Sequence, residues 1–483
     1  MRLRLPSGAP SGSVLIIVLW IAFGLVALAL YFADSMNFEL RASQNRVATQ
    51  ASDQAIEGAA RYINYILSNQ ITNGSNGCIP GPDTYVHEAV PVGEAHFWLI
   101  GRDSNNISGP TKLCFGLVDE ASKLNLNTVS SNALSWLPRM TEDLTQAILD
   151  WRDTNGNGPT ATYYAMEQPS YVCKGADFET VDELRLLYGA DMDILVGNDI
   201  NRNGILDPDE NNDQDNQSDP GIIEFLTPYT REPNTNSDGS ALINITDLAA
   251  GSAQLQGLLQ TNFGDSRASQ IMSSLGLSSG AGSGRGAGGG GGGGAGGGGG
   301  RSMAGGQSAR AGAAATTTRF NGLVDFYIKS SMTMTEFAQV WTNLTATNGP
   351  YIEGRVNVNT ASYTVLTCLL NGDTSGAQQL VNYRQNNPAN LTSVAWVVDA
   401  LQQSDPTALT NLEAGDFITA QTFQFTADIA ALGPHGRGYR RVRFVFDTSS
   451  GVPQIVYRQD LAHLGWALGR ETREHWLLAK GTE

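Results

Sequence analysis

An uncharged apolar run near the N-terminus constrains this 483-residue chain more than any other feature. It covers residues 13–33 and follows a short leader that carries Arg2 and Arg4. About 20 apolar residues are enough for a helix to cross a membrane. In the segment after the run, neither proline nor glycine occurs before Gly58, and apolar residues recur at helical spacing. The sequence therefore predicts one helix from about residue 14 to 67, half in lipid and half in water. The basic leader places the N-terminus in the cytoplasm.

The overall composition excludes several classes of protein. A chain of this length exceeds one compact core, so two or more folded units are expected after the helix. The net charge of -17 disfavours nucleic acid, because affinity for phosphates comes mainly from lysine and arginine. The four cysteines contain no CxxC pair, which argues against zinc. Cys78 and Cys114 are the nearest in sequence and the first candidates for a disulfide, with free thiols as the alternative.

Strand-like segments lie on both sides of a long central region. The first two are 96–101 and 111–118, and the C-terminal ones are 422–427, 440–446 and 454–457, the last two joined by a turn at 447–451. Together they predict a small sheet that packs on the exposed half of the long helix. The basic cluster of this region comprises Arg437, Arg440, Arg441 and Arg443. We interpret it as a solvated edge strand, because Phe444 would point to the face opposite Arg441 and Arg443.

An internal repeat occupies the central region. Residues 123–128 read KLNLNT, residues 355–361 read RVNVNTA, and a weaker copy, LINIT, covers 242–246. Helical stretches follow the first two copies, at 133–149 with a break near Pro138 and at 365–380. Because short polar side chains accept amide hydrogens at helix starts, the Asn-Thr pairs predict N-caps. Each copy thus predicts a strand, a cap and two helices.

One local motif predicts a metal site. Residues 199–210, DINRNGILDPDE, fit the calcium-loop pattern D-x-N-x-N-G-x5-E. In that pattern the side chains at alternate positions supply oxygen, one backbone carbonyl contributes, and the last glutamate binds through both oxygens. The predicted ligands are Asp199, Asn201, Asn203, Ile205 through its carbonyl, Asp207 and Glu210. The alternative is an acidic surface loop without an ion.

Two weaker candidates for calcium lie nearby in the sequence. The first repeats the opening half of the pattern with Asp153, Asn155 and Asn157, but a tyrosine stands where the closing glutamate would fall. The second places Asp213, Asp215 and Asp219 close to the main loop. Packed like charges repel unless a cation lies among them. Solvated acidic loops are the alternative for both.

Catalytic motifs are missing from the sequence. None of the five histidines stands in HExxH spacing, and neither a GxSxG elbow nor a Walker loop occurs. The glycine-rich tract at 278–318 lacks the GK[ST] ending of a phosphate loop, and it is expected to be a flexible insertion. The sequence therefore predicts a protein that is not an enzyme.

The leader, the apolar run and its helical continuation resemble the type IV pilin and pseudopilin family. The resemblance implies that a prepilin peptidase cuts between Gly12 and Ser13 and methylates the new N-terminus. An ordinary secretory signal would instead be cut after the run, near Ala29 or Ala33. At the fifth position after the cut most pilins carry glutamate, whereas this chain has Ile17. That departure, the paired repeats and the segment 150–189 (DWRD to LLYG) resemble the minor pseudopilin K family of the type II secretion system, general secretion pathway protein K.

This resemblance implies an α+β fold, in which a long N-terminal transmembrane and pilin helix packs on a small β-sheet and an α-helical domain of helix-hairpin-helix or SAM-like type is inserted. The expected parts are the leader (1–12), the helix (13–72), pilin-like strands (73–120), a helical calcium-holding domain (121–277), the glycine-rich insertion (278–318), a second helix-hairpin-helix-like module (319–415) and C-terminal strands (416–483).

The implied function is to cap the tip of the periplasmic pseudopilus during protein export. The implied partners are I- and J-type minor pseudopilins, the pseudopilus and the prepilin peptidase, and the chain would cross the inner membrane once with its soluble domain in the periplasm. Calcium would be held in that domain. A minor pilin of a type IV pilus is the nearest alternative. A membrane-anchored helix-hairpin-helix protein that binds nucleic acid is the other, and the acidic charge disfavours it.

Overall fold

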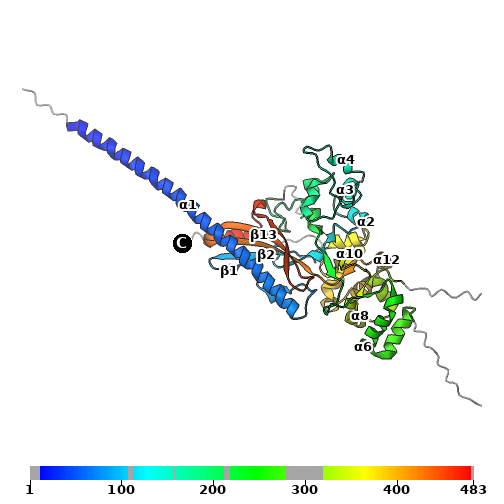
Figure 1. Ribbon diagram of the computed structural model, residues 1–483. Coiled ribbons are helices and arrows are strands. Elements are labelled where there is room, and N and C mark those ends of the chain that lie inside the picture. The colour runs from blue at the N-terminus through cyan, green and yellow to red at the C-terminus, as the bar shows by residue number, and fades with distance from the viewer. Residues whose placement is uncertain (1–10, 107–111, 157, 212–217, 278–318, 480–483) are drawn as a thin grey trace, which may run out of the picture.

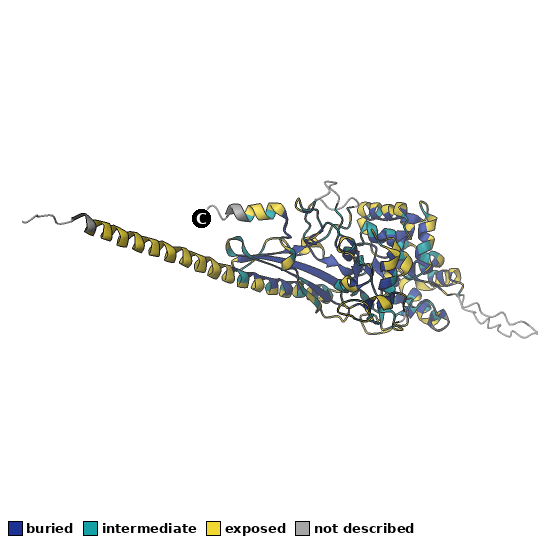
Figure 2. Ribbon diagram, turned by 90° about the horizontal axis from the view of Figure 1, so that it is seen from above, coloured by how far each residue is buried: buried dark blue, intermediate teal, exposed yellow. Residues whose placement is uncertain are grey.

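A single long helix dominates the N-terminal part of the computed structural model, which describes residues 11–106, 112–156, 158–211, 218–277 and 319–479. Helix α1 runs over Ser11–Thr72, 62 residues without a break, as the sequence predicts. Its side chains are exposed from Val14 to Val47, and burial begins at Ala48. Figures 1 and 2 show this exposed half projecting away from the rest of the molecule.

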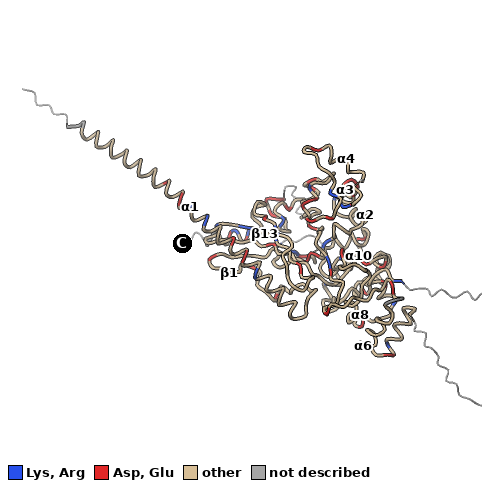
Figure 3. The backbone as a smooth tube through the Cα atoms, in the orientation of Figure 1, with Lys and Arg blue, Asp and Glu red and all other residues tan. Residues whose placement is uncertain are grey.

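The exposed half of α1 has the properties of a membrane span. Among the described residues, α1 alone is long and apolar enough to cross a membrane, with a mean hydropathy of 2.8 over its most apolar window. Figure 3 shows the N-terminal part of the helix in tan, without charged residues. The predicted single span is therefore confirmed as a candidate by length and composition.

The second half of α1 packs on a six-stranded antiparallel sheet with the order β1-β2-β12-β13-β14 and β3 beside β12. Two clusters of strands far apart in sequence build this sheet. They are β1 (Val90–Val92), β2 (Ala95–Ile100) and β3 (Val118–Asp119), and β12 (Gln424–Gly433), β13 (Arg437–Asp447) and β14 (Gln454–Asp460). All helical modules are thus inserted between β3 and β12.

The core between helix and sheet follows from two periodicities. Ala55, Ala59 and Ile63 lie on one face of α1, because residues four apart share a helix face. Alternate residues of the strands, such as Ile429 and Phe444, meet them, because successive strand residues point to opposite faces. The predicted packing of a sheet on the long helix is therefore confirmed.

The predicted strands agree with the structure except for one. The three C-terminal strands are present and longer than predicted, and the turn at 447–451 joins β13 to β14. The strand expected at 111–118 is wrong. Within its described part only Phe115 forms an isolated bridge, to Ile100, and β3 begins at Val118. Its backbone still bonds to the end of β2, since Gly101 donates to the carbonyl of Cys114 and Gly116 to that of Leu99, both at 2.8 Å. Gly116, with a φ of 146°, interrupts the extended chain before β3.

The repeat consists of three modules rather than two. Each copy of the repeat contains a short strand, which pairs in parallel with a second short strand that ends in threonine. The pairs are β4 (Leu124–Asn125) with β5 (Leu226–Thr227), β7 (Ile243–Asn244) with β8 (Leu344–Thr345), and β10 (Val356–Asn357) with β11 (Ile418–Thr419). We call the enclosed residues the first (124–227), second (243–345) and third (356–419) helical modules. Each strand pair holds the two ends of its module together.

In the first and third modules the first asparagine of the repeat forms a turn, and the second bonds to a distant residue, Asn127 to Phe178 and Asn359 to Trp396, without capping a helix. Asn125 accepts the amide hydrogen of Asn127, and Asn357 accepts that of Asn359, at 2.8 and 3.0 Å. Such Asx turns redirect the chain after a strand. The following helices α2 and α9 begin at caps supplied by Ser130 and Ser362 instead. The predicted Asn-Thr caps are therefore wrong by a few residues, although the helices are present.

The helices of the modules are short apart from α6. The first module holds α2 (Ser131–Ser135), α3 (Glu142–Arg152), α4 (Ala161–Tyr164) and α5 (Met192–Leu195); the second α6 (Leu248–Ser274), α7 (Leu323–Ser330) and α8 (Met334–Val340); and the third α9 (Tyr363–Leu369), α10 (Thr374–Asn386), α11 (Ala395–Leu401) and α12 (Pro406–Glu413). The last helix, α13 (Gly469–Ala479), follows the sheet.

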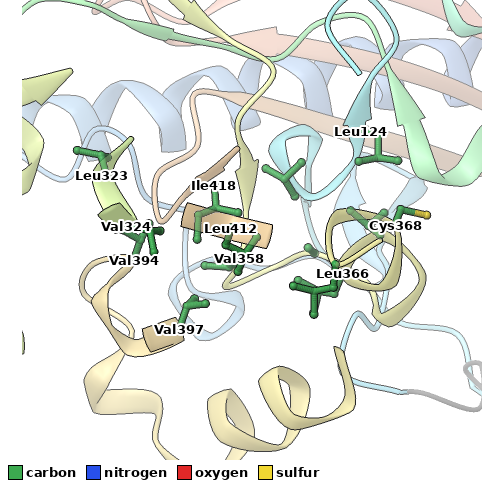
Figure 4. Close-up of a cluster of buried hydrophobic side chains, with 14 of the residues drawn as sticks. Leu124, Leu323, Val324, Val358, Leu366, Cys368, Val394, Val397, Leu412 and Ile418 are labelled. Carbon is green, nitrogen blue, oxygen red and sulfur yellow. The ribbon is translucent and has the colours of Figure 1, made fainter. Parts of the chain in front are cut away.

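One hydrophobic core joins the three modules. Figure 4 shows Leu124 of the first module, Leu323 of the second, and Val358 and Cys368 of the third in the same cluster. Helix α6, before the glycine-rich residues, packs on α7 and α8, after them. Residues 243–277 and 319–345 therefore belong to one module. The predicted glycine-rich insertion at 278–318 lies outside the described residues.

The candidate disulfide between Cys78 and Cys114 is not formed, because both residues are free thiols. Gly77, next to Cys78, accepts a hydrogen bond from Thr422. Cys114 accepts one from Gly101, whose neighbour Ile100 pairs with Asp428. Thr422 and Asp428 are six residues apart along an extended chain, which is roughly 20 Å. A disulfide needs Cα atoms within about 7 Å. Proximity in sequence was therefore misleading here.

Candidate metal site and its anchorage

The loop at 199–210 is folded around its own first and last carboxylates. Asp199 accepts amide hydrogens from Asn203 and Gly204 at 3.0 and 2.8 Å. Glu210 accepts those of Asn201 and Asp207 at 3.0 and 3.1 Å. Gly204 has a φ of 87°, which L side chains rarely adopt, and thus permits the turn. The structure therefore brings the predicted ligands into one compact loop.

Four of the predicted side-chain ligands are buried, namely Asp199, Asn201, Asn203 and Glu210, and Asp207 is half-buried. Asp207 accepts hydrogen bonds from the amides of Asn201 and Asn203 at 2.7 and 2.9 Å. Asp199 and Asn203 are each 1% exposed, and Glu210 is 6% exposed. Burial raises the pKa of Glu210 to about 6, and the charges of Asp199 and Asp207 add to the rise. Burial also raises the pKa of Asp199.

The donor set fits a hard cation. Its atoms are carboxylate and amide oxygens plus the Ile205 carbonyl, the ligand types that calcium prefers. Within the described ranges, no group of three His, Cys, Asp or Glu side chains is arranged to hold a metal ion. Asp199, Asp207 and Glu210 are thus not close enough together to hold a cation by themselves. The asparagine oxygens and the Ile205 carbonyl would have to complete the site. A cation would also relieve the repulsion between Asp199, Asp207 and Glu210.

Two arginines hold the loop against the sheet. Arg441 of β13 donates to the carbonyls of Asn201 and Arg202, the latter at 2.8 Å. Arg102, just after β2, donates to the carbonyls of Arg202 and Asn203 at 3.0 and 3.2 Å. Three successive carbonyls of the loop thus accept hydrogen bonds from guanidinium groups.

Each of these arginines is neutralised by a carboxylate. Arg441 is 2.7 Å from Asp428 of β12, and both side chains are buried. Arg102 is 2.7 Å from Glu224. The neighbouring Arg443 shares Asp428 at 2.9 Å. These guanidinium charges lower the pKa of Asp428 against the effect of burial.

The interpretation of β13 as a solvated edge strand is wrong. β13 lies between β12 and β14, and Arg441 is 0% exposed. The alternation of Arg441 and Arg443 with Phe444 was identified correctly, but the arginine face is covered by the loop. The signal that could have revealed this is Asp428, a lone acid in the otherwise apolar stretch 427–432. A buried acid in such a strand needs a cationic partner.

The C-terminal segment, residues 461–468, also contacts the loop. The side-chain amide of Asn201 donates to the carbonyl of Trp466, and that of Asn203 to the carbonyl of Ala467, both at 3.3 Å. Ala467 is itself held by the hydroxyl of Tyr439, which accepts its amide hydrogen at 3.2 Å. Segments more than 200 residues apart therefore meet at this loop.

The weaker metal candidates are placed differently. Asp153 accepts two hydrogen bonds from Asn155, which is exposed, so this turn is satisfied locally. Asp219 forms a 2.7 Å ion pair with Arg139. Asn157, Asp213 and Asp215 lie outside the described residues.

The predicted helix-hairpin-helix units correspond to α2–α3, the first hairpin, and α9–α10, the second hairpin, and the described residues of both contain few basic side chains. Helices α2 and α9 contact each other, and Asn132 donates to Asn371 at 2.7 Å. Arg139, in the first hairpin, pairs with Asp219. Arg384, in the second, is buried and donates to backbone carbonyls, including that of Val358. These side chains are therefore engaged within the protein.

The predicted cleavage junction lies at the start of α1. Gly12 and Ser13 belong to its first turn. Ile17, where most pilins carry glutamate, is 58% exposed on the projecting half of the helix.

The fold and the loop together define an α+β protein in which a projecting apolar helix packs on an antiparallel sheet with inserted helical modules. No protein-family model and no curated protein sequence matches the chain. Among solved structures it is similar to a chain of the GspK-GspI-GspJ complex from the type 2 secretion system of enterotoxigenic Escherichia coli. The match covers 87% of this chain and 99% of that chain, at 9% sequence identity and a TM-score of 0.43.

Proposed function

We propose that this chain is a K-type minor pseudopilin of a type II secretion system. The observation that carries the proposal is the division of α1. Its first half is apolar, uncharged up to Asp34 and exposed, whereas its second half forms the core of a sheet domain. A helix of this kind serves as a membrane anchor before assembly and as a packing element in a filament afterwards.

The placement of the modules supports a position at the filament tip. Figure 1 shows the helical modules at the end of the molecule opposite the N-terminus of α1. In a filament built from parallel helices, they would occupy the space of the next subunit outward. Ile17 also lacks the carboxylate that in the family pairs with the N-terminal amine of a neighbour. Both features favour a subunit with neighbours on one side, the I- and J-type minor pseudopilins being the proposed partners.

The loop at 199–210 is the proposed calcium site. Bound calcium would supply positive charge between Asp199, Asp207 and Glu210 and thus stabilise the loop. The chain's own residues position the oxygens, as described above. Its proposed role is structural, and the proposed location of the site is the periplasm.

The first test concerns the N-terminus. Mass spectrometry of the protein extracted from membranes should give a mature chain that begins at a methylated Ser13. Gly12→Val should remain uncut, whereas the matched variant Gly8→Val should be processed normally. A mature N-terminus after Ala29 or Ala33 would show a secretory signal and contradict the proposal.

The second test concerns the tip. Gold-labelled antibodies against the soluble region should mark one end of overproduced pseudopili, while antibodies against the major pseudopilin mark their whole length. Label along the filament would exclude a cap. Co-purification with a type IV pilus, and not with the secretion pseudopilus, would favour the alternative of a minor pilin.

The third test concerns calcium. At a calcium concentration 100 times Kd, binding to the folded state alone should add about 2.7 kcal/mol to the free energy of unfolding. Scanning calorimetry in calcium, in magnesium and in chelator measures this. An unchanged melting temperature in all three would reject the calcium site while leaving the pseudopilin assignment in place.

A further inference from the structure

The C-terminal segment (Leu461–Leu468) is bonded to the same asparagines that are proposed as ligands. Each asparagine amide group has two hydrogens. In Asn201 one is donated to Asp207 and the other to the carbonyl of Trp466. In Asn203 they are donated to Asp207 and to the carbonyl of Ala467. Turning either amide around would lose both hydrogen bonds, so each Oδ1 keeps its direction.

The direction of these oxygens is toward the inside of the loop. The Oδ1 of Asn201 accepts the amide hydrogen of Asn203, and the Oδ1 of Asn203 accepts that of Ile205, both at 2.9 Å. The C-terminal segment therefore helps to hold both side-chain oxygens against the backbone of the loop.

The backbone of the loop is held by the sheet in a complementary way. Arg441 and Arg102 bind the carbonyls of residues 201–203, as described above. These carbonyls are thereby turned onto the sheet and away from the loop interior. Glu224 pairs with Arg102, and Asp428 pairs with Arg441 while also being shared by Arg443. These carboxylates therefore offset part of the positive charge that would repel a cation.

We propose that Arg441, Arg102 and the backbone of Trp466–Ala467 position the loop at 199–210 for its cation, so that cation binding and the docking of the C-terminal segment on the sheet are coupled. This inference rests on the calcium site of the proposed function. Outer partners that orient metal ligands commonly change metal affinity 10- to 100-fold. Because coupling free energies are reciprocal, the cation must stabilise the docked segment by the same factor.

The test is calorimetric titration of calcium into the full chain in detergent micelles. Arg441→Lys keeps the charge but loses the fork that reaches two carbonyls, and we expect Kd to rise at least about tenfold. Arg443→Lys is the matched control, since Arg443 pairs with the same Asp428 and is not bonded to the loop in the described contacts. Its Kd should stay within about twofold of the wild type.

A milder variant covers the case in which Arg441→Lys does not fold. Tyr439→Phe removes only the hydroxyl that accepts the amide hydrogen of Ala467. We expect Kd to rise about threefold to tenfold, with Tyr457→Phe on the neighbouring strand as control. If the wild type binds calcium and both Arg441→Lys and Tyr439→Phe bind it equally well, the coupling is wrong. If the wild type binds none, the calcium site and the coupling both fail.

Hydrogen exchange measures the reciprocal effect, which is the stabilisation of the docked C-terminal segment by calcium. Calcium should slow exchange in the C-terminal segment as well as in the loop, while helix α11 stays unchanged. Arg441→Lys should weaken the slowing in the segment, and Arg443→Lys should leave it intact. Slowing confined to residues 199–210 would overturn the proposal.

Discussion

Two loops of the first helical module share the same opening pattern but have different surroundings. Residues 199–204 read DINRNG and residues 153–158 read DTNGNG. In the first loop Asp199 and Asn203 are buried, and the backbone is bound by two arginines. In the second, Asn155 is exposed and is bonded within its own turn. The spacing of the potential ligands in the sequence therefore does not distinguish a loop that is anchored on the sheet from a surface turn.

The difference arises from what the nearest arginines contact. Arg441 and Arg102 come from the sheet and bind the first loop. Arg152, directly before the second loop, donates instead to the carbonyls of Leu126 and Val129 in the repeat, the latter at 2.7 Å. It thus stabilises the start of the module, and among the described contacts it forms no hydrogen bond to the second loop.

The largest expected effect comes from breaking the anchor of the first loop. Asp428→Asn removes the carboxylate that pairs with Arg441 and Arg443. Removing one partner of a buried ion pair leaves an uncompensated charge, so the free energy of unfolding should fall by about 3–5 kcal/mol. Urea titration of the full chain in micelles measures it.

The control for this experiment is a surface pair from the same strand. Arg440 lies 3.2 Å from Asp53, with both side chains over a third exposed. Asp53→Asn should cost less than about 1 kcal/mol. Equal losses in the two variants would show that burial of the Asp428 pair has no special role.

The second prediction compares the loops through calcium. Glu210→Gln removes the carboxylate that closes the first loop, and the affinity for calcium should fall about 30- to 100-fold. Asp153→Asn, in the second loop, should change it less than about twofold. Calorimetric titration decides between them, and a larger loss in Asp153→Asn would move the site to the second loop.

The third prediction is a pH dependence of the metal-free protein. The pKa of Glu210 is raised to about 6 from 4.5, so its stabilising contribution is full below pH 4.5 and is lost as pH rises through 6. The difference in unfolding free energy between wild type and Glu210→Gln should shift by about 2 kcal/mol between pH 4 and pH 7. Urea titrations in chelator at both pH values measure it, and a constant difference would contradict the burial of Glu210.

The smallest expected effect compares the two turn glycines. Gly204 and Gly156 both have positive φ, at 87° and 62°, so alanine is strained at either position. A Cβ at Gly204 would lie 2.8 Å from Arg102, whereas at Gly156 it would meet open space. Gly204→Ala should therefore be less stable than Gly156→Ala by about 1 kcal/mol. Equal thermal stabilities would mean that Arg102 moves aside without cost.

Much of the fold could be predicted from local patterns. The long helix, the C-terminal strands and the broken helices after the repeat each depend on periodicity within a few residues of one another. The copy of the repeat at 242–246 is the weakest in sequence, yet it begins a module like the other two. The partner strands of the three copies share a Leu-Thr or Ile-Thr pair, at Thr227, Thr345 and Thr419, which is a further sequence signal for the three modules.

The candidate site was predicted only in part. The spacing of Asp199 to Glu210 identified the loop, because a folded loop of this kind is local. Its anchors were missed, since Arg441 and the backbone of Trp466 lie more than 200 residues away. Asp428 identifies Arg441 as buried only once β12 and β13 are known to pair.

The sequence by itself determined the helix that divides between an apolar and an amphipathic half, the repeated module starts and the order of ligands in the loop. These features depend on neighbours at distances of two to eleven residues. Only the tertiary structure decided that β13 is internal, that its arginines are buried, and that the C-terminal segment reaches the loop. The identity of a charged residue does not show whether its side chain is solvated or buried. That depends on whether a strand distant in the sequence places the opposite charge beside it.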